Sequence, residues 1–181
     1  MKKSTGPKKT SKKAKAVAVC AMFAALGVVA IGAAAVLDVL DMFLALFASA
    51  FIFIAVIEFG APAALAVWLA TSALSLILFP HNTAAWMYLI FTGWYPVFKR
   101  SVEKLHYVIS WIVKLSAFNT CCLVYWLVAT KVLLIPTELF GWLIPVFALV
   151  INAAFIMFDI AASKLITLYI FRWRRRLGFK D

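Results

Sequence analysis

Long apolar segments alternate with short polar breaks along most of this 181-residue chain. An apolar helix of about 20 residues is long enough to cross the hydrocarbon core of a bilayer. Six segments follow the pattern, and they cover residues 16–36, 42–59, 61–78, 84–98, 107–130 and 140–171. The pattern therefore predicts an all-α fold, a polytopic membrane bundle of six transmembrane helices.

Two of the six segments depart from a straight crossing. Segment 84–98 is short and contains Gly93 and Pro96, so we expect its helix to be tilted, kinked or broken. Segment 140–171 is longer than a hydrocarbon core of about 30 Å requires at about 1.5 Å per residue. We therefore expect it to tilt, kink or extend beyond the membrane.

The composition supports lipid as the main solvent. Hydrophobic residues make up 66% of the chain, charged residues only 14%, and the mean hydropathy is +1.03. Soluble domains carry about 25% charged residues. An aromatic-rich soluble core is the alternative, but the seven Trp residues suit the headgroup level of a membrane.

The net charge of +11 is concentrated at the two ends of the chain. The basic residues of these ends are Lys2, Lys3, Lys8, Lys9, Lys12, Lys13, Lys15, Arg172, Arg174, Arg175, Arg176 and Lys180. Basic blocks beside apolar segments set topology and attract anionic lipid. We predict a disordered basic tail at 1–15, a transmembrane domain at 16–171 and a basic tail at 172–181, with no nucleic-acid partner.

The basic residues also predict the orientation. An even number of crossings places both tails and the Lys99–Lys104 loop on one side, whereas Asp38 and Asp41 fall on the other. The positive-inside rule then puts both termini in the cytoplasm of a multi-pass cell-membrane protein. A cleaved secretory signal is the alternative for the first segment, but 16–36 is longer than the usual apolar core of about 7–15 residues.

The first apolar segment carries small residues four positions apart. Ala21 with Ala25, and Ala30 with Ala34, would each lie on one helix face. Small residues let helices approach closely in lipid. Two interpretations stay open: packing within the chain, or docking of a separate membrane subunit.

Charged residues inside the apolar segments are the most informative, because an unpaired charge at membrane depth is costly. Lys114 and Asp159 lie at similar predicted depths on antiparallel helices, so we expect them to pair. Glu58 is the competing partner for Lys114. Such a pair either fastens helices or takes part in function.

A second group of polar residues is predicted near the outer side and along the last apolar segment. The substrate-binding candidates are Asp38, Asp41, His81, Asn82, Asn119 and Asn152. Carboxylate and imidazole groups also suit divalent metals, which makes Asp38, Asp41 and His81 a weak cation-site alternative. Ordinary polar turns explain these residues better than a cation site does, and we predict no metal.

Motifs for common enzyme chemistry are missing from the sequence. It contains no phosphate loop, nucleophile elbow, zinc-binding His-Glu-x-x-His helix or Cys-x-x-Cys pair. Cys20, Cys121 and Cys122 lie in apolar segments, where reduced cysteines serve as small packing residues. We expect neither an enzyme nor a cofactor.

The six-helix plan, the Lys-rich start and the Ala21-Met-Phe-Ala-Ala25 motif resemble the substrate-binding S components of energy-coupling factor transporters. The resemblance implies that the small-residue face of the first helix docks onto a transmembrane T component driven by ATPase subunits. It also implies that external loops close over a small-molecule substrate, a vitamin or similar micronutrient.

These observations lead to one main hypothesis and two alternatives. The first is a membrane-embedded substrate-binding subunit of a micronutrient uptake transporter, without its own ATPase. The second is a non-transporting scaffold or assembly factor whose polar residues fasten helices. The third is a small proton-coupled carrier that uses Asp159 and Lys114.

Overall fold

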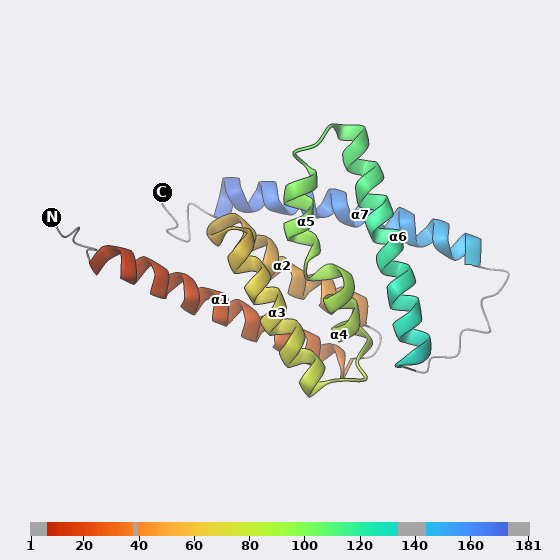
Figure 1. The fold of residues 1–181 in the computed structure, drawn as a ribbon, viewed down its shortest axis with the longest axis horizontal. Coiled ribbons are helices and arrows are strands. Elements are labelled where there is room, and N and C mark those ends of the chain that lie inside the picture. Colours follow the sequence, from red (N-terminus) through yellow and green to blue (C-terminus); the bar gives the residue numbers. More distant parts are fainter. Residues whose placement is uncertain (1–6, 38–39, 134–143, 174–181) are drawn as a thin grey trace. The chain divides into compact units, whose positions relative to one another are not determined.

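The computed structural model describes residues 7–37, 40–133 and 144–173, and in this part of the chain the regular structure is helical (Figure 1). The α-helices are α1 (Pro7–Ala34), α2 (Asp41–Phe59), α3 (Ala61–Leu78), α4 (Thr83–Met87), α5 (Tyr95–Val102), α6 (Tyr107–Lys131) and α7 (Ile144–Leu168). Two π-helical segments, η2 (Tyr88–Thr92) and η4 (Tyr169–Trp173), follow α4 and α7. The predicted all-α class is confirmed.

Five of the described helices are long and apolar enough to cross a membrane. The spans are Ala14–Ala34, Asp41–Phe59, Ala61–Leu78, Tyr107–Lys131 and Val146–Arg172. They correspond to five of the six segments predicted from the hydrophobic pattern. The chain is therefore a multi-pass helical membrane protein.

The remaining predicted segment, 84–98, is broken. Helix α4 ends at Met87, η2 follows, and α5 begins at Tyr95 after a turn. The Gly93 N–H donates to the Tyr88 carbonyl at 2.9 Å, which closes the wide π turn. A Cβ at Gly93 would lie 2.8 Å from that carbonyl oxygen and against the Trp68 indole, so glycine permits the close approach.

The amino-terminal tail prediction needs a correction. Helix α1 already begins at Pro7, whereas residues 1–15 were predicted to be disordered. Proline is favourable at the first helical position, and the Lys and Ala residues that follow are good helix formers. Residues 1–6 lie outside the described residues, as does 174–181 of the predicted carboxy-terminal tail; Arg172 and Trp173 belong to η4.

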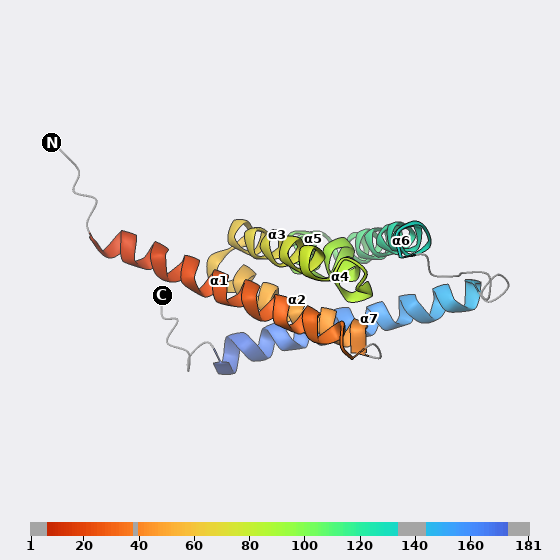
Figure 2. The same cartoon turned by 90° about the horizontal axis from the view of Figure 1, so that it is seen from below.

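The chain divides into two compact units, Met1–Phe98 and Lys99–Asp181, with the boundary inside α5. In the first unit, α1, α2 and α3 pack side by side (Figures 1 and 2). A Cβ at Gly27 would lie 2.9 Å from Thr71 Cγ2, so glycine allows α1 to approach α3 closely. Most of the buried core side chains here are small, as close helix packing in lipid requires.

The second unit is built on α6 and α7. The Phe118 and Phe155 rings stack with their centroids 4.3 Å apart and their planes 8° from parallel. Polar and charged side chains on either side of this stack also join the two helices, Lys114 with Asp159 and Asn119 with Asn152. The aromatic stack therefore lies between two polar contacts of α6 with α7.

Candidate functional site

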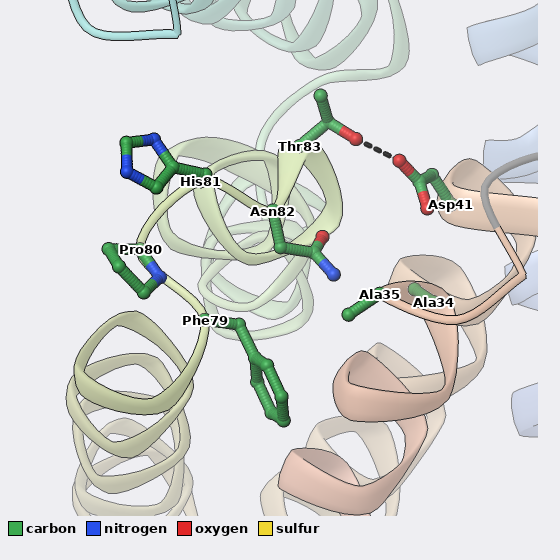
Figure 3. A pocket seen from close by; sticks show the side chains of 8 residues that line it. All are labelled: Ala34, Ala35, Asp41, Phe79, Pro80, His81, Asn82 and Thr83. Atoms are coloured by element: carbon green, nitrogen blue, oxygen red, sulfur yellow. Dashed lines mark hydrogen bonds between the residues drawn. The ribbon is translucent and has the colours of Figure 1, made fainter.

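A pocket of about 490 Å³ opens in the first unit, where α1 ends, α2 begins and α3 turns into α4 (Figure 3). The residues that line it are Ala34, Ala35, Asp41, Phe79, Pro80, His81, Asn82 and Thr83. Asp41, His81 and Asn82, three of the predicted substrate-binding residues, thus line one space. Asp38, a fourth, lies outside the described residues.

Asn82 fixes the turn that forms one wall of the pocket. Its Oδ1 accepts hydrogen bonds from the backbone N–H groups of Ala84 at 2.7 Å and Ala85 at 3.3 Å, which makes it the N-cap of α4. Its Nδ2 donates to the Ile31 carbonyl of α1 at 3.3 Å. One side chain therefore caps α4 and ties it to α1.

The Thr83 hydroxyl donates a hydrogen bond to Asp41 Oδ2 and so joins α4 to α2 across the pocket (Figure 3). Asp41 lies in the first turn of α2, where the helix dipole stabilises a carboxylate. Sequence reasoning did not select Thr83 as a binding residue. Its position directly after the Asn82 cap, at the start of a short helix, was the available signal.

His81 lies on the exposed rim, and Figure 3 shows its ring pointing away from Asp41. Within the described ranges, no three His, Cys, Asp or Glu side chains are grouped so that they could hold a metal ion. Asp41 and His81 therefore face different parts of the pocket. The pocket is a polar-rimmed cleft with an aromatic wall from Phe79.

Other buried polar groups of the same unit lie on α3 and η2, two elements that contact each other. Five of them have no hydrogen-bond partner within the described part of the chain: Trp68 Nε1, Ser72 Oγ, Ser75 Oγ, Tyr88 OH and Thr92 Oγ1. On α3 the three residues are spaced four and three apart, and in η2 the two residues are four apart. Each set therefore lies on one face of its helix. We call the four hydroxyl groups among them the hydroxyl column; sequence reasoning missed it because Ser and Thr are common in apolar helices.

The second unit contains a compact group of four charged side chains, which we call the four-charge cluster. The Lys114 ammonium lies 2.9 Å from Asp159 Oδ2 and 3.3 Å from Glu103 Oε1. The Lys99 ammonium lies 2.7 Å from the same Glu103 oxygen and also pairs with Asp159 Oδ1. Each lysine therefore contacts both carboxylates.

Burial separates one member of the cluster from the other three. The side chains of Lys99, Lys114 and Asp159 are 1%, 5% and 4% exposed, whereas that of Glu103 is 44% exposed. The Lys114–Asp159 pair was predicted, with Glu58 as the alternative; Glu58 belongs to the other unit. Sequence reasoning placed Lys99 in a charged loop, but its side chain is buried and its ammonium pairs with Asp159 of α7.

Asn119 and Asn152, the other two predicted substrate-binding residues, pair with each other in the second unit. Each Nδ2 donates to the partner's Oδ1, at 3.0 and 3.1 Å. Each also donates to the carbonyl four residues earlier, Leu115 and Ala148, at 2.8 Å. Each amide group thus donates one hydrogen bond across to the other helix and one within its own helix, and the reciprocal pair fastens α6 to α7.

The two small-residue repeats of α1 separate in the structure. Ala30 and Ala34 are buried within the first unit, at 7% and 0% exposure. Ala21 and Ala25 are exposed. The Ala30–Ala34 repeat thus packs within the chain, whereas the Ala21–Ala25 repeat is exposed on the surface of α1.

Comparisons of the chain with protein-family models, with curated proteins and with solved structures found no match. The pocket, the four-charge cluster and the exposed face of α1 are the features of the chain that bear on its function.

Proposed function

We propose that this protein is a membrane-embedded substrate-binding subunit of an uptake system, which captures a small polar molecule and depends on partner subunits for energy. The observation that carries the proposal is the pocket lined by Asp41, Asn82 and Thr83. Its volume of about 490 Å³ lies within the range of about 300–1,000 Å³ that is typical of small-molecule sites. In the predicted topology the pocket faces the outside of the cell.

The pocket is held in shape before any ligand binds. The Asn82 amide ties α4 to α1, and the Thr83 hydroxyl ties α4 to α2. A ligand then binds without ordering these segments, which lowers the entropic cost of association. The Asp41 carboxylate and the Phe79 ring suit a ligand with hydrogen-bond donors beside an apolar portion.

The exposed Ala21–Ala25 face supports a separate membrane partner. The sequence has no phosphate loop of its own, so energy for uptake would come from other subunits. Docking on small residues agrees with the resemblance to S components, whose partners are a T component and ATPase subunits. Under this proposal the substrate is a vitamin or similar micronutrient, and the basic ends bind anionic lipid.

The test is native mass spectrometry of the detergent-purified protein, followed by ligand titration of two variants of α2. Asp41→Asn removes the pocket carboxylate at the start of the helix, and Glu58→Gln is the control at its other end. A lost charged hydrogen bond corresponds to about 1.5–3 kcal/mol, so Asp41→Asn should weaken binding about 10- to 100-fold. The control should bind as the wild type does.

Two results would contradict the proposal. A wild-type protein that retains no small molecule, and that no candidate micronutrient stabilises, would support the scaffold alternative. Equal ligand affinity in Asp41→Asn and wild type would remove the pocket from the binding site.

A proton-coupled carrier is the second candidate, and the four-charge cluster is the observation that favours it. Ionisable groups inside membrane spans often mark ion or proton pathways. A carrier would transport its substrate in liposomes without partner subunits and would lose transport on Asp159→Asn. If the purified protein alone does not transport, and partner subunits restore transport, the protein is a binding subunit and not a carrier.

A further inference from the structure

The buried part of the four-charge cluster is not neutral by itself. Lys99 and Lys114 contribute two positive charges and Asp159 one negative charge, and all three side chains are at most 5% exposed. A net positive charge among buried groups is costly in a membrane protein. The second negative charge comes from Glu103, whose side chain is 44% exposed.

The two carboxylates are held very differently. Asp159 lies within α7, and each of its oxygens takes one ammonium. Glu103 follows the last residue of α5 and reaches the lysines with one oxygen, Oε1, at 2.7 and 3.3 Å. Asp159 is therefore a fixed part of the site, and Glu103 is a side chain on the solvent side that fills a position between two ammonium groups.

We propose that Lys99 and Lys114 form a binding site for a small carboxylate anion, and that Glu103 is the built-in occupant that such an anion replaces. An oxygen of an external carboxylate at the Oε1 position would accept the same two charge-assisted hydrogen bonds. The Trp111 ring, whose centroid lies 5.3 Å from the Lys114 ammonium, forms an aromatic wall beside it. The site belongs to the second unit and does not depend on the pocket of the first.

Competition with the tethered Glu103 side chain sets the affinity of the site for a free carboxylate. A group on a short tether has an effective concentration in the millimolar range or above. The wild-type protein should therefore bind a free carboxylate weakly. Glu103→Ala removes the occupant and leaves both its space and the unbalanced charge, so this variant should bind the anion more tightly.

The experiment measures thermal unfolding of the full-length protein in detergent while sodium acetate replaces sodium chloride at constant ionic strength. Glu103→Ala should unfold at a lower temperature than wild type in chloride. Its midpoint should rise by about 3 °C or more as acetate saturates the site. The wild type should rise by less than half as much, and Glu58→Ala should follow the wild type.

A charge-balanced double variant shows where the acetate acts. Glu103→Ala combined with Lys114→Met leaves Lys99 with Asp159, a neutral pair that needs no further anion. The unfolding midpoint of this variant should rise with acetate no more than that of the wild type does. A rise equal to that of Glu103→Ala would mean that acetate acts elsewhere and would overturn the proposal.

An absent effect would overturn it as well. If Glu103→Ala responds to acetate no more than Glu58→Ala does, the lysines do not form an anion site. If Glu103→Ala is not obtained folded, Glu103→Ser is titrated in the same way. Serine also removes the charge and leaves the space of the carboxylate open, and the same two outcomes decide.

Discussion

Replacing Asp159 by asparagine perturbs the centre of the four-charge cluster with little change of shape. The asparagine keeps the size of the side chain but removes the negative charge that faces both ammonium groups. Lys99 and Lys114 then share only the half-exposed Glu103. The variant therefore tests whether a buried counter-charge holds α5, α6 and α7 together in the second unit.

The size of the effect follows from burial. Removing one partner of a buried ion pair costs about 3–5 kcal/mol, because the other charge stays buried without compensation. For a protein of this size each kcal/mol lowers the unfolding temperature by about 2–4 °C, so Asp159→Asn should lower it by about 6–20 °C. Glu103→Gln should cost about 1 kcal/mol or less, since water screens the exposed carboxylate.

The assay is thermal unfolding in detergent of the single variants and of Asp159→Asn combined with Lys114→Met. The double variant retains Lys99 with Glu103, so its charges balance, and it should recover at least half of the loss. This non-additivity measures the interaction between the two positions. The reasoning is refuted if Asp159→Asn loses less than about 1 kcal/mol, or if adding Lys114→Met lowers stability further by its full separate cost.

Two other predictions concern helix surfaces in the first unit. Leucine at Ala21 or Ala25 should abolish copurification with a membrane partner, whereas Ala70→Leu on the exposed face of α3 should not; unchanged copurification in all three would exclude this docking face. Gly93→Ala should lower stability by about 1–3 kcal/mol, because its Cβ would press on the Tyr88 carbonyl oxygen 2.8 Å away. Gly32→Ala, which meets only the movable end of the Phe79 ring at 3.0 Å, should cost less in the same unfolding assay.

Hydrophobic length predicted the long helices well, because lipid leaves a chain few ways to satisfy its backbone. The break at Gly93 was also predictable, since glycine and proline interrupt a short apolar segment. Pairing of Lys114 with Asp159 followed from equal depth along antiparallel helices. These inferences need only distance along the chain and the cost of an unpaired charge.

Side-chain partners from distant helices were beyond sequence reasoning. The sequence places Lys99 in a charged loop, whereas in the structure its side chain is buried and its ammonium pairs with Asp159 of α7. Asn119 and Asn152 were expected in a substrate pocket, but a side-chain amide finds its partner through helix packing. The position of each asparagine in the sequence does not reveal that the other one faces it.

The early start of α1 was missed for a different reason. A lysine-rich segment with Gly6 and Pro7 looks like a tail, but proline at the first position and the Lys and Ala residues after it are compatible with a helix. Composition alone does not separate these two outcomes. The hydroxyl column was missed because no single Ser or Thr in it is unusual for an apolar helix.

The π turn at η2 constrains the number of residues in this segment more than their identity. Its wide hydrogen-bonded ring holds one more residue than an α-helical turn. Losing one residue there would restore ordinary helical bonding but rotate Gly93 by about 100° away from Trp68. Over evolution, substitutions between Tyr88 and Thr92 should therefore be tolerated more readily than a single insertion or deletion.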